Sequence, residues 1–184
     1  MNDSLGIAFH GAARTVTGSR HLLRFGARTW LFDCGLYQGH RDEAERVNRT
    51  FRFAPGDVDA VVVSHAHLDH IGNLPTLSAQ GFRGPVHMTP ATADLARVML
   101  ADSAFLMQKD VEHVNRRRAG QQAPRRPLYT VADVEALTAA DRPYKKGKTL
   151  SESLAILGRF KLEGHIDPDL FDVVIFDEAS QIPM

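Results

Sequence analysis

The feature that most restricts the fold is a cluster of three histidines and one aspartate directly after an apolar run. The run covers residues 58–63, and the pattern H-x-H-x-D-H follows over residues 65–70. The four side chains are those of His65, His67, Asp69 and His70. An apolar run of this kind predicts a buried strand. A loop that leaves the carboxyl end of a strand can direct the first two histidines to one position and the Asp-His pair to a neighbouring one.

The chemistry of these side chains predicts a metal centre. Neutral imidazoles and a carboxylate suit zinc, and two neighbouring ions would ease the loss of a proton from a water molecule between them. One alternative is a set of surface polar residues or hydrogen-bonded histidines, which the dense spacing disfavours. A second alternative is a structural zinc site. Such sites usually complete their coordination with cysteines, and Cys34 is the only cysteine of the chain.

This motif resembles the signature of metallo-β-lactamase-fold hydrolases, whose αββα sandwich holds one or two metals at the ends of its strands. The resemblance implies that His65 and His67 bind a first zinc ion and that Asp69 and His70 bind a second. It further implies that Asp69 touches the attacking water. The run 31–39 is similar to the first motif of the family, in which the aspartate, here Asp33, orients the ligands without binding metal.

Four further motifs resemble the β-CASP branch of this family, whose members process RNA. They are residues 11–19, 72–75, 81–85 and 127–130, the last with Asp133. The resemblance implies a phosphodiester hydrolase, most simply a zinc-dependent ribonuclease, and it implies that the loop 11–19 lines the substrate site. Without the family, that loop is only a glycine-bounded connection between strands. Asp33, taken alone, is equally well a carboxylate in a turn.

The remaining pattern predicts an α/β fold, a partial αββα sandwich. We expect strands at residues 5–10, 20–25, 29–32 and 58–63, and a short exposed helix at 41–49. A helix beginning at Thr89 and Pro90 is expected to pack on the sheet through the apolar residues that recur at helical spacing. These are Leu95, Val98, Met99, Phe105 and Leu106. We expect an exposed loop over 116–127 and a helix capped by Thr130 and Asp133.

Charge and composition limit the partners. Lys plus Arg and Asp plus Glu both total 22, so no net charge attracts RNA or a membrane. The arginines at 116, 117, 118, 125 and 126 could touch an RNA backbone, but a solvated loop is the simpler interpretation because no aromatic side chain lies among them. The lone cysteine and the lack of an apolar span favour a cytoplasmic protein. RNA or another phosphodiester is the expected substrate, and a homodimer is a further expectation.

The end of the sequence departs from the family pattern, so we expect a truncated metallo-β-lactamase-like domain at 1–142 and a divergent tail at 143–184. His165 lies where a further metal ligand is expected, but the run 167–169 replaces the Gly- and Ser-rich residues that should follow it. Residues 171–183 are similar to the magnesium-binding strand of superfamily 1 helicases. Residues 147–149 are similar to the end of a phosphate-binding loop, but Arg142 replaces its first glycine, so a basic linker is the simpler interpretation. Weak activity is therefore expected. The alternatives are a non-catalytic metal-binding remnant, or a chimeric chain with a helicase fragment.

Overall fold

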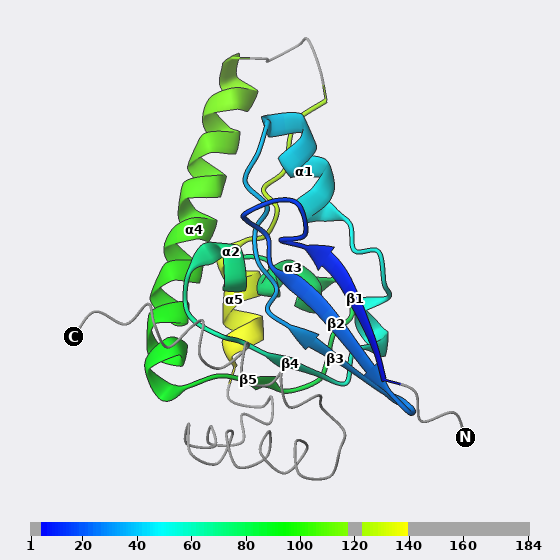
Figure 1. The fold of residues 1–184 in the computed structure, drawn as a ribbon. Helices are drawn as coiled ribbons and strands as arrows, with labels where there is room; N and C mark the ends of the chain where they lie inside the picture. Colours follow the sequence, from blue (N-terminus) through cyan, green and yellow to red (C-terminus); the bar gives the residue numbers. More distant parts are fainter. Residues whose placement is uncertain (1–4, 118–122, 140–184) are drawn as a thin grey trace, which may run out of the picture. The chain divides into compact units, whose positions relative to one another are not determined.

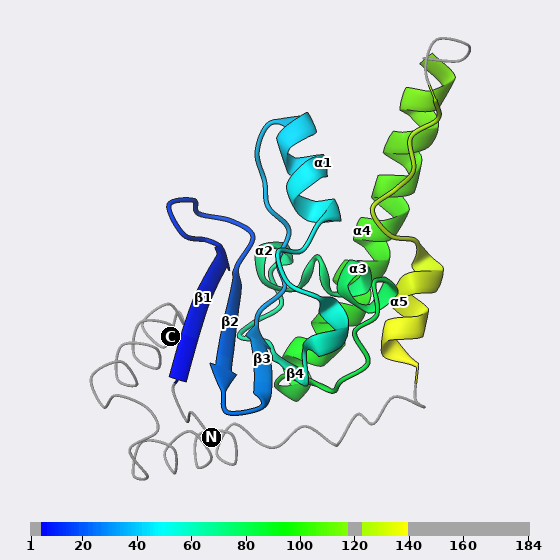
Figure 2. The ribbon, with the colours of Figure 1, turned by 90° about the vertical axis from the view of Figure 1, so that its right-hand side faces the viewer.

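The computed structural model describes residues 5–117 and 123–139. These residues form a five-stranded sheet in the order β1-β2-β3-β4-β5 with helices on one side of it (Figures 1 and 2). The strands are β1 (Leu5–Gly11), β2 (Arg20–Phe25), β3 (Arg28–Phe32), β4 (Ala60–Val62) and β5 (Val86–His87). The helices are α1 (Arg41–Arg49), α2 (Leu68–Ile71), α3 (Leu74–Ala79), α4 (Pro90–Arg117) and α5 (Val131–Thr138), with a 3₁₀ turn at Pro55–Asp57. The expected α/β class is confirmed.

The sheet changes from antiparallel to parallel pairing, and this positions the histidine motif at one edge. β1, β2 and β3 pair antiparallel, whereas β3, β4 and β5 run parallel. Phe32 at the end of β3 therefore pairs with Val62 at the end of β4. Because β2 runs the opposite way, its first residue, Arg20, begins at this same edge. Three chain segments that are distant in sequence thus meet where the two parallel strands end.

The core lies between the sheet and the helices and is built from apolar side chains of both. Leu31 and Val61 from the strands and Ile71, Leu77 and Phe82 from the helical side are completely buried. The apolar run expected as a strand over 58–63 forms regular pairing only at Ala60–Val62, although its two end residues are also buried. The run thus supplies core side chains at Val58, Val61 and Val63 and ladder bonds over its middle.

The helix α4 begins at Pro90 as predicted, but the prediction of its buried face was wrong. Leu95, Val98, Phe105 and Leu106 are 52–69% exposed, and only Met99 of the expected residues packs against the core. The buried residues are Thr92, Ala96, Leu100, Ser103 and Ala104. They are mostly small, so the backbone of α4 approaches its neighbours closely. Those neighbours are mainly α5 and α2, not the strands, which corrects the expected packing on the sheet.

The segment before α5 also differs from the predicted exposed loop. Arg116 and Arg117 belong to the last turn of α4. Arg125 is half-buried, with its guanidinium 3.2 Å from Glu45 and 3.6 Å from Asp42. The capping box of α5 is confirmed, because the Thr130 hydroxyl accepts from the Asp133 amide and the Asp133 carboxylate accepts from the Thr130 amide. Through Arg125, the segment before α5 contacts α1.

Several expectations fall outside the described residues. They concern Arg118, His165, the phosphate-loop remnant at 147–149, the helicase-like run at 171–183 and the boundary at 142. The division into a domain at 1–142 and a tail at 143–184 remains a prediction. Within the described residues, no helix combines the length and apolar character that a membrane span requires.

The buried face of α4 can be tested with two leucines of the same helix. Leu100→Ala is expected to destabilise the protein by about 2–5 kcal/mol, because Leu100 is 1% exposed and its removal leaves a cavity. Leu95→Ala should cost less than about 1 kcal/mol, because Leu95 is 57% exposed. Urea unfolding of both variants measures the difference. Equal losses of stability would contradict the burial pattern.

Candidate metal centre

The four side chains of the histidine motif converge at the end of β4. The Nε2 atom of His65 lies 3.0 Å from the Nδ1 atom of His67. The rings of His65 and His70 have centroids 4.0 Å apart. Nε2 of His70 lies 3.6 Å from Oδ2 of Asp69. The motif therefore forms one compact group of donor atoms, with its side chains half-buried or exposed to solvent.

These donors fall into two close pairs, His65 with His67 and Asp69 with His70. Two ligands about 2.05 Å from a tetrahedral zinc ion lie about 3.3 Å apart, close to the spacing within each pair. The donor chemistry of three imidazoles and one carboxylate also fits a divalent ion. Across residues 5–117 and 123–139, however, no three His, Cys, Asp or Glu side chains are arranged as the ligands of one ion. Each pair therefore contributes two candidate donor atoms.

The carboxylate of Asp33 lies behind the histidines and holds them through several hydrogen bonds. It is 6% exposed and follows the end of β3 with a left-handed backbone, φ 58°. Nδ1 of His70 is 2.8 Å from its Oδ2 atom. The Ser64 amide and hydroxyl donate to Oδ1 at 2.8 and 3.0 Å, and the Ser19 hydroxyl donates to Oδ2 at 3.2 Å. Asp33 therefore contacts one proposed ligand directly and stands behind the loop that carries the others.

The bond to Asp33 determines which nitrogen of His70 faces the metal position. A carboxylate only accepts hydrogen bonds, so Nδ1 of His70 carries the proton. In the neutral ring, Nε2 then holds the lone pair, and this is the atom that lies next to Asp69. Asp33 itself belongs to neither donor pair, and its orienting role remains a prediction.

Backbone hydrogen bonds fix the loop after Asp33 against the start of α2. The amides of Cys34 and Leu36 donate to the carbonyls of His70 and Leu68, at 2.7 and 2.9 Å. The Ser19 amide donates to the Asp69 carbonyl at 2.9 Å. Ser19, the last residue of the loop 11–19, thus contacts the motif. The Thr17 hydroxyl of the same loop accepts from the Gln38 amide at 2.9 Å.

A buried arginine holds the loop that follows Asp33. Arg20 is 3% exposed, and its guanidinium donates to the Gly35 carbonyl at 3.0 and 3.1 Å, to the Val47 carbonyl and to the Asn48 side chain. Burial lowers the pKa of Arg20. Because its acceptors come from the loop after Asp33 and from α1, Arg20 connects this helix to the loop beside the candidate metal centre. The sequence alone did not single out Arg20 or Asn48, since neither belongs to a chemical motif.

Two other groups near the site are inert or neutral. Burial raises the pKa of the Cys34 thiol to about 12, so this side chain is a protonated core residue and not a thiolate ligand. Burial also lowers the pKa of His21, an effect that the nearby Asp33 charge partly opposes. His21 is therefore mainly neutral at pH 7.

Ser19 and Ser64 are polar residues of the site to which the sequence alone assigned no role.

Comparison with known proteins agrees with this geometry. Residues 18–145 match the metallo-beta-lactamase superfamily. The chain belongs to this superfamily. Membership of this superfamily implies a divalent metal ion. The fold that the sequence predicted is that of the superfamily.

Individual relatives indicate which branch of the superfamily the chain resembles. Ribonuclease TTHA0252 of Thermus thermophilus is 40% identical over 89% of this chain and 33% of its own length. Transcription termination factor FttA of Methanocaldococcus jannaschii is 32% identical over 87% of this chain and 23% of its own length. A solved metallo-beta-lactamase structure from Cronobacter sakazakii is 27% identical, with a TM-score of 0.37, over 48% of this chain and 30% of that one. The chain spans a third or less of the curated relatives, which confirm the resemblance to the β-CASP branch.

The close contact between the two site loops gives a prediction for Gly35. A Cβ atom at this position would lie 1.5 Å from the carbonyl oxygen of Asp69. Gly35→Ala is therefore expected to separate the loops and to destabilise the protein by about 1–3 kcal/mol or more. Gly6→Ala is the control, because a Cβ there meets nothing within 4 Å. Urea unfolding compares the two, and a harmless Gly35→Ala would contradict the packing of the loops.

Proposed function

We propose that this chain carries part of the dinuclear zinc centre of a phosphodiester hydrolase that acts on RNA. The observation that carries the proposal is the arrangement of four donor atoms in two facing pairs, His65 with His67 and Asp69 with His70. Imidazole nitrogen and carboxylate oxygen are ligands that zinc accepts at such spacings. RNA as the substrate is supported by the 40% identity to a ribonuclease.

The residues would divide the work as follows. His65 and His67 would hold one ion, and Asp69 and His70 the other. Bound zinc supplies Lewis acidity, which eases proton loss from water and neutralises charge on a phosphate oxygen. The Asp69 carboxylate would also orient the attacking water. Asp33 would act by keeping His70 in one orientation and one tautomer, a role supported by the 2.8 Å contact between them.

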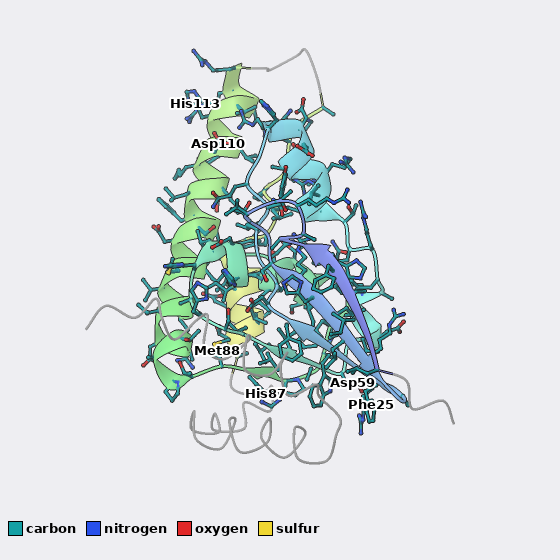
Figure 3. All side chains as sticks on the ribbon, in the orientation of Figure 1. Phe25, Asp59, His87, Met88, Asp110 and His113 are labelled. Atoms are coloured by element: carbon teal, nitrogen blue, oxygen red, sulfur yellow. The ribbon has the colours of Figure 1, made fainter. Side chains whose placement is uncertain are left out.

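Metal binding is the first test of the proposal. The full chain is expected to bind zinc, measured by elemental analysis after gel filtration and by titration against a chelator of known affinity. His67→Ala removes one donor of a pair and should lower zinc affinity at least about 100-fold, a loss beyond the 10–100-fold typical of indirect partners. His113→Ala is the matched control, because Figure 3 shows His113 near the last turns of α4. Equal zinc binding by wild type and His67→Ala would refute the assignment of the ligands.

Cleavage of RNA is the second test. Zinc-loaded wild type should cut an end-labelled RNA oligonucleotide, and His67→Ala should reduce the rate at least about 100-fold, since both charge neutralisation and the activated water depend on bound metal. His113→Ala should cleave like the wild type. Zinc binding without any cleavage would instead support a non-catalytic metal-binding role for this chain.

A further inference from the structure

The hydroxyl of Ser64 occupies the centre of the polar contacts behind the metal centre. Its Oγ atom lies 3.0 Å from both carboxylate oxygens of Asp33. The same Oγ atom lies 3.0 Å from Nδ1 of His65 and 3.2 Å from Nδ1 of His70. A hydroxyl has one hydrogen and two lone pairs, so it cannot donate to all of these partners. The donors and acceptors can be assigned from the chemistry of the neighbours.

The carboxylate of Asp33 takes the single hydroxyl hydrogen. Ionised carboxylates only accept, so the contacts between Ser64 and Asp33 require Ser64 to donate. The lone pairs of Oγ are then directed toward the two imidazoles. His70 has a closer acceptor for its Nδ1 hydrogen, because Oδ2 of Asp33 is 2.8 Å away. The remaining hydrogen bond of Ser64 is with His65, and in it Ser64 accepts.

This assignment determines the tautomer of His65. Nδ1 of His65 must carry a hydrogen in order to donate to the Ser64 oxygen, so the lone pair of the neutral ring lies on Nε2. That nitrogen is the one 3.0 Å from Nδ1 of His67, in the first donor pair. A chain of hydrogen bonds therefore runs from Asp33 through Ser64 to His65, parallel to the direct bond from Asp33 to His70.

We propose that Ser64 is a positioning residue that selects the Nδ1-protonated tautomer of His65 and so presents Nε2 to the metal. The proposal rests on the proposed function for its metal, but the hydrogen bond itself exists without one. The orienting effect of Asp33 thus reaches one ligand of each pair. It reaches His70 directly and His65 through the serine hydroxyl.

The tautomer can be measured in the metal-free full chain by long-range ¹H–¹⁵N correlation of the histidine rings. The signals of His65 are assigned by their loss in His65→Gln. Wild type should show His65 protonated at Nδ1, and Ser64→Ala should move its population toward the Nε2-protonated form. Ser64→Thr keeps a hydroxyl and should behave as wild type, whereas the equally shaped Ser64→Val should behave as Ser64→Ala. The threonine and valine pair separates loss of the hydroxyl from loss of folding.

Ser19→Ala is the matched control. Its hydroxyl also donates to Asp33, at 3.2 Å, but its other contact is with His21 and not with His65. This variant should leave the His65 tautomer unchanged. Zinc affinity should fall about 10–100-fold in Ser64→Ala and Ser64→Val, as is typical when a partner behind a ligand is lost, and should be close to wild type in Ser64→Thr.

The outcomes distinguish this inference from the proposed function. If wild type binds no zinc, the proposed metal centre fails, while the tautomer measurement still decides the role of Ser64. If wild type binds zinc and neither Ser64→Ala nor Ser64→Val changes the His65 tautomer, the inference is overturned and the metal centre stands. An equal tautomer shift in Ser19→Ala would also overturn it, because the effect would then come from Asp33 and not from the Ser64 hydroxyl.

Discussion

The buried carboxylate of Asp33 is the interaction on which this structure depends. A charge that is 6% exposed is costly unless hydrogen bonds replace its water, and here the donors come from Ser19, Ser64 and His70. These partners belong to three segments: the start of β2, the end of β4 and α2. Satisfying one carboxylate therefore requires all three segments to meet at the edge where β3 and β4 end. The left-handed backbone of Asp33, which aspartate tolerates better than most residues, turns the chain so that its side chain faces them.

The strand order makes this meeting possible, and close backbone contact makes it rigid. Parallel pairing of β3 and β4 brings the ends of both strands to one edge, so that Asp33 lies beside Ser64. The loop after β3 then exchanges amide-to-carbonyl bonds with α2, where Gly35 leaves room for the Asp69 carbonyl. Backbone hydrogen bonds between these two segments thus hold the donor atoms in place. The side chains of the motif therefore converge even though they belong to a loop and a one-turn helix.

Local patterns in the sequence predicted the parts of the fold that local forces determine. The bounds of β2 and α1 and the capping box of α5 agree with the structure, because alternation, charge and capping act within a few residues. The predicted buried face of α4 was wrong. Two sets of apolar residues recur at helical spacing in this segment, and the prediction chose the set with the larger side chains, such as Leu95. Small residues such as Ala96 and Ala104 form the packed stripe, and only tertiary contact shows this. Likewise, the sequence pattern singled out the four candidate ligands and Asp33, whereas the role proposed for Ser64 depends on which atoms surround its hydroxyl.

The charges of the described residues also explain why the proposed metal ions would matter for an anionic substrate. Arg28, Arg41, Arg49 and Arg125 all form ion pairs with Asp or Glu. Pairs of this exposure add little stability, but each carboxylate offsets the positive charge of its arginine toward a phosphate backbone. The whole chain is equally balanced, with net charge zero. Two divalent ions at the motif would place about four positive charges at one point, so attraction for RNA would arise where the phosphodiester is cut. Binding and catalysis would then depend on the same ligands, and the orientation of His65 and His70 would influence both.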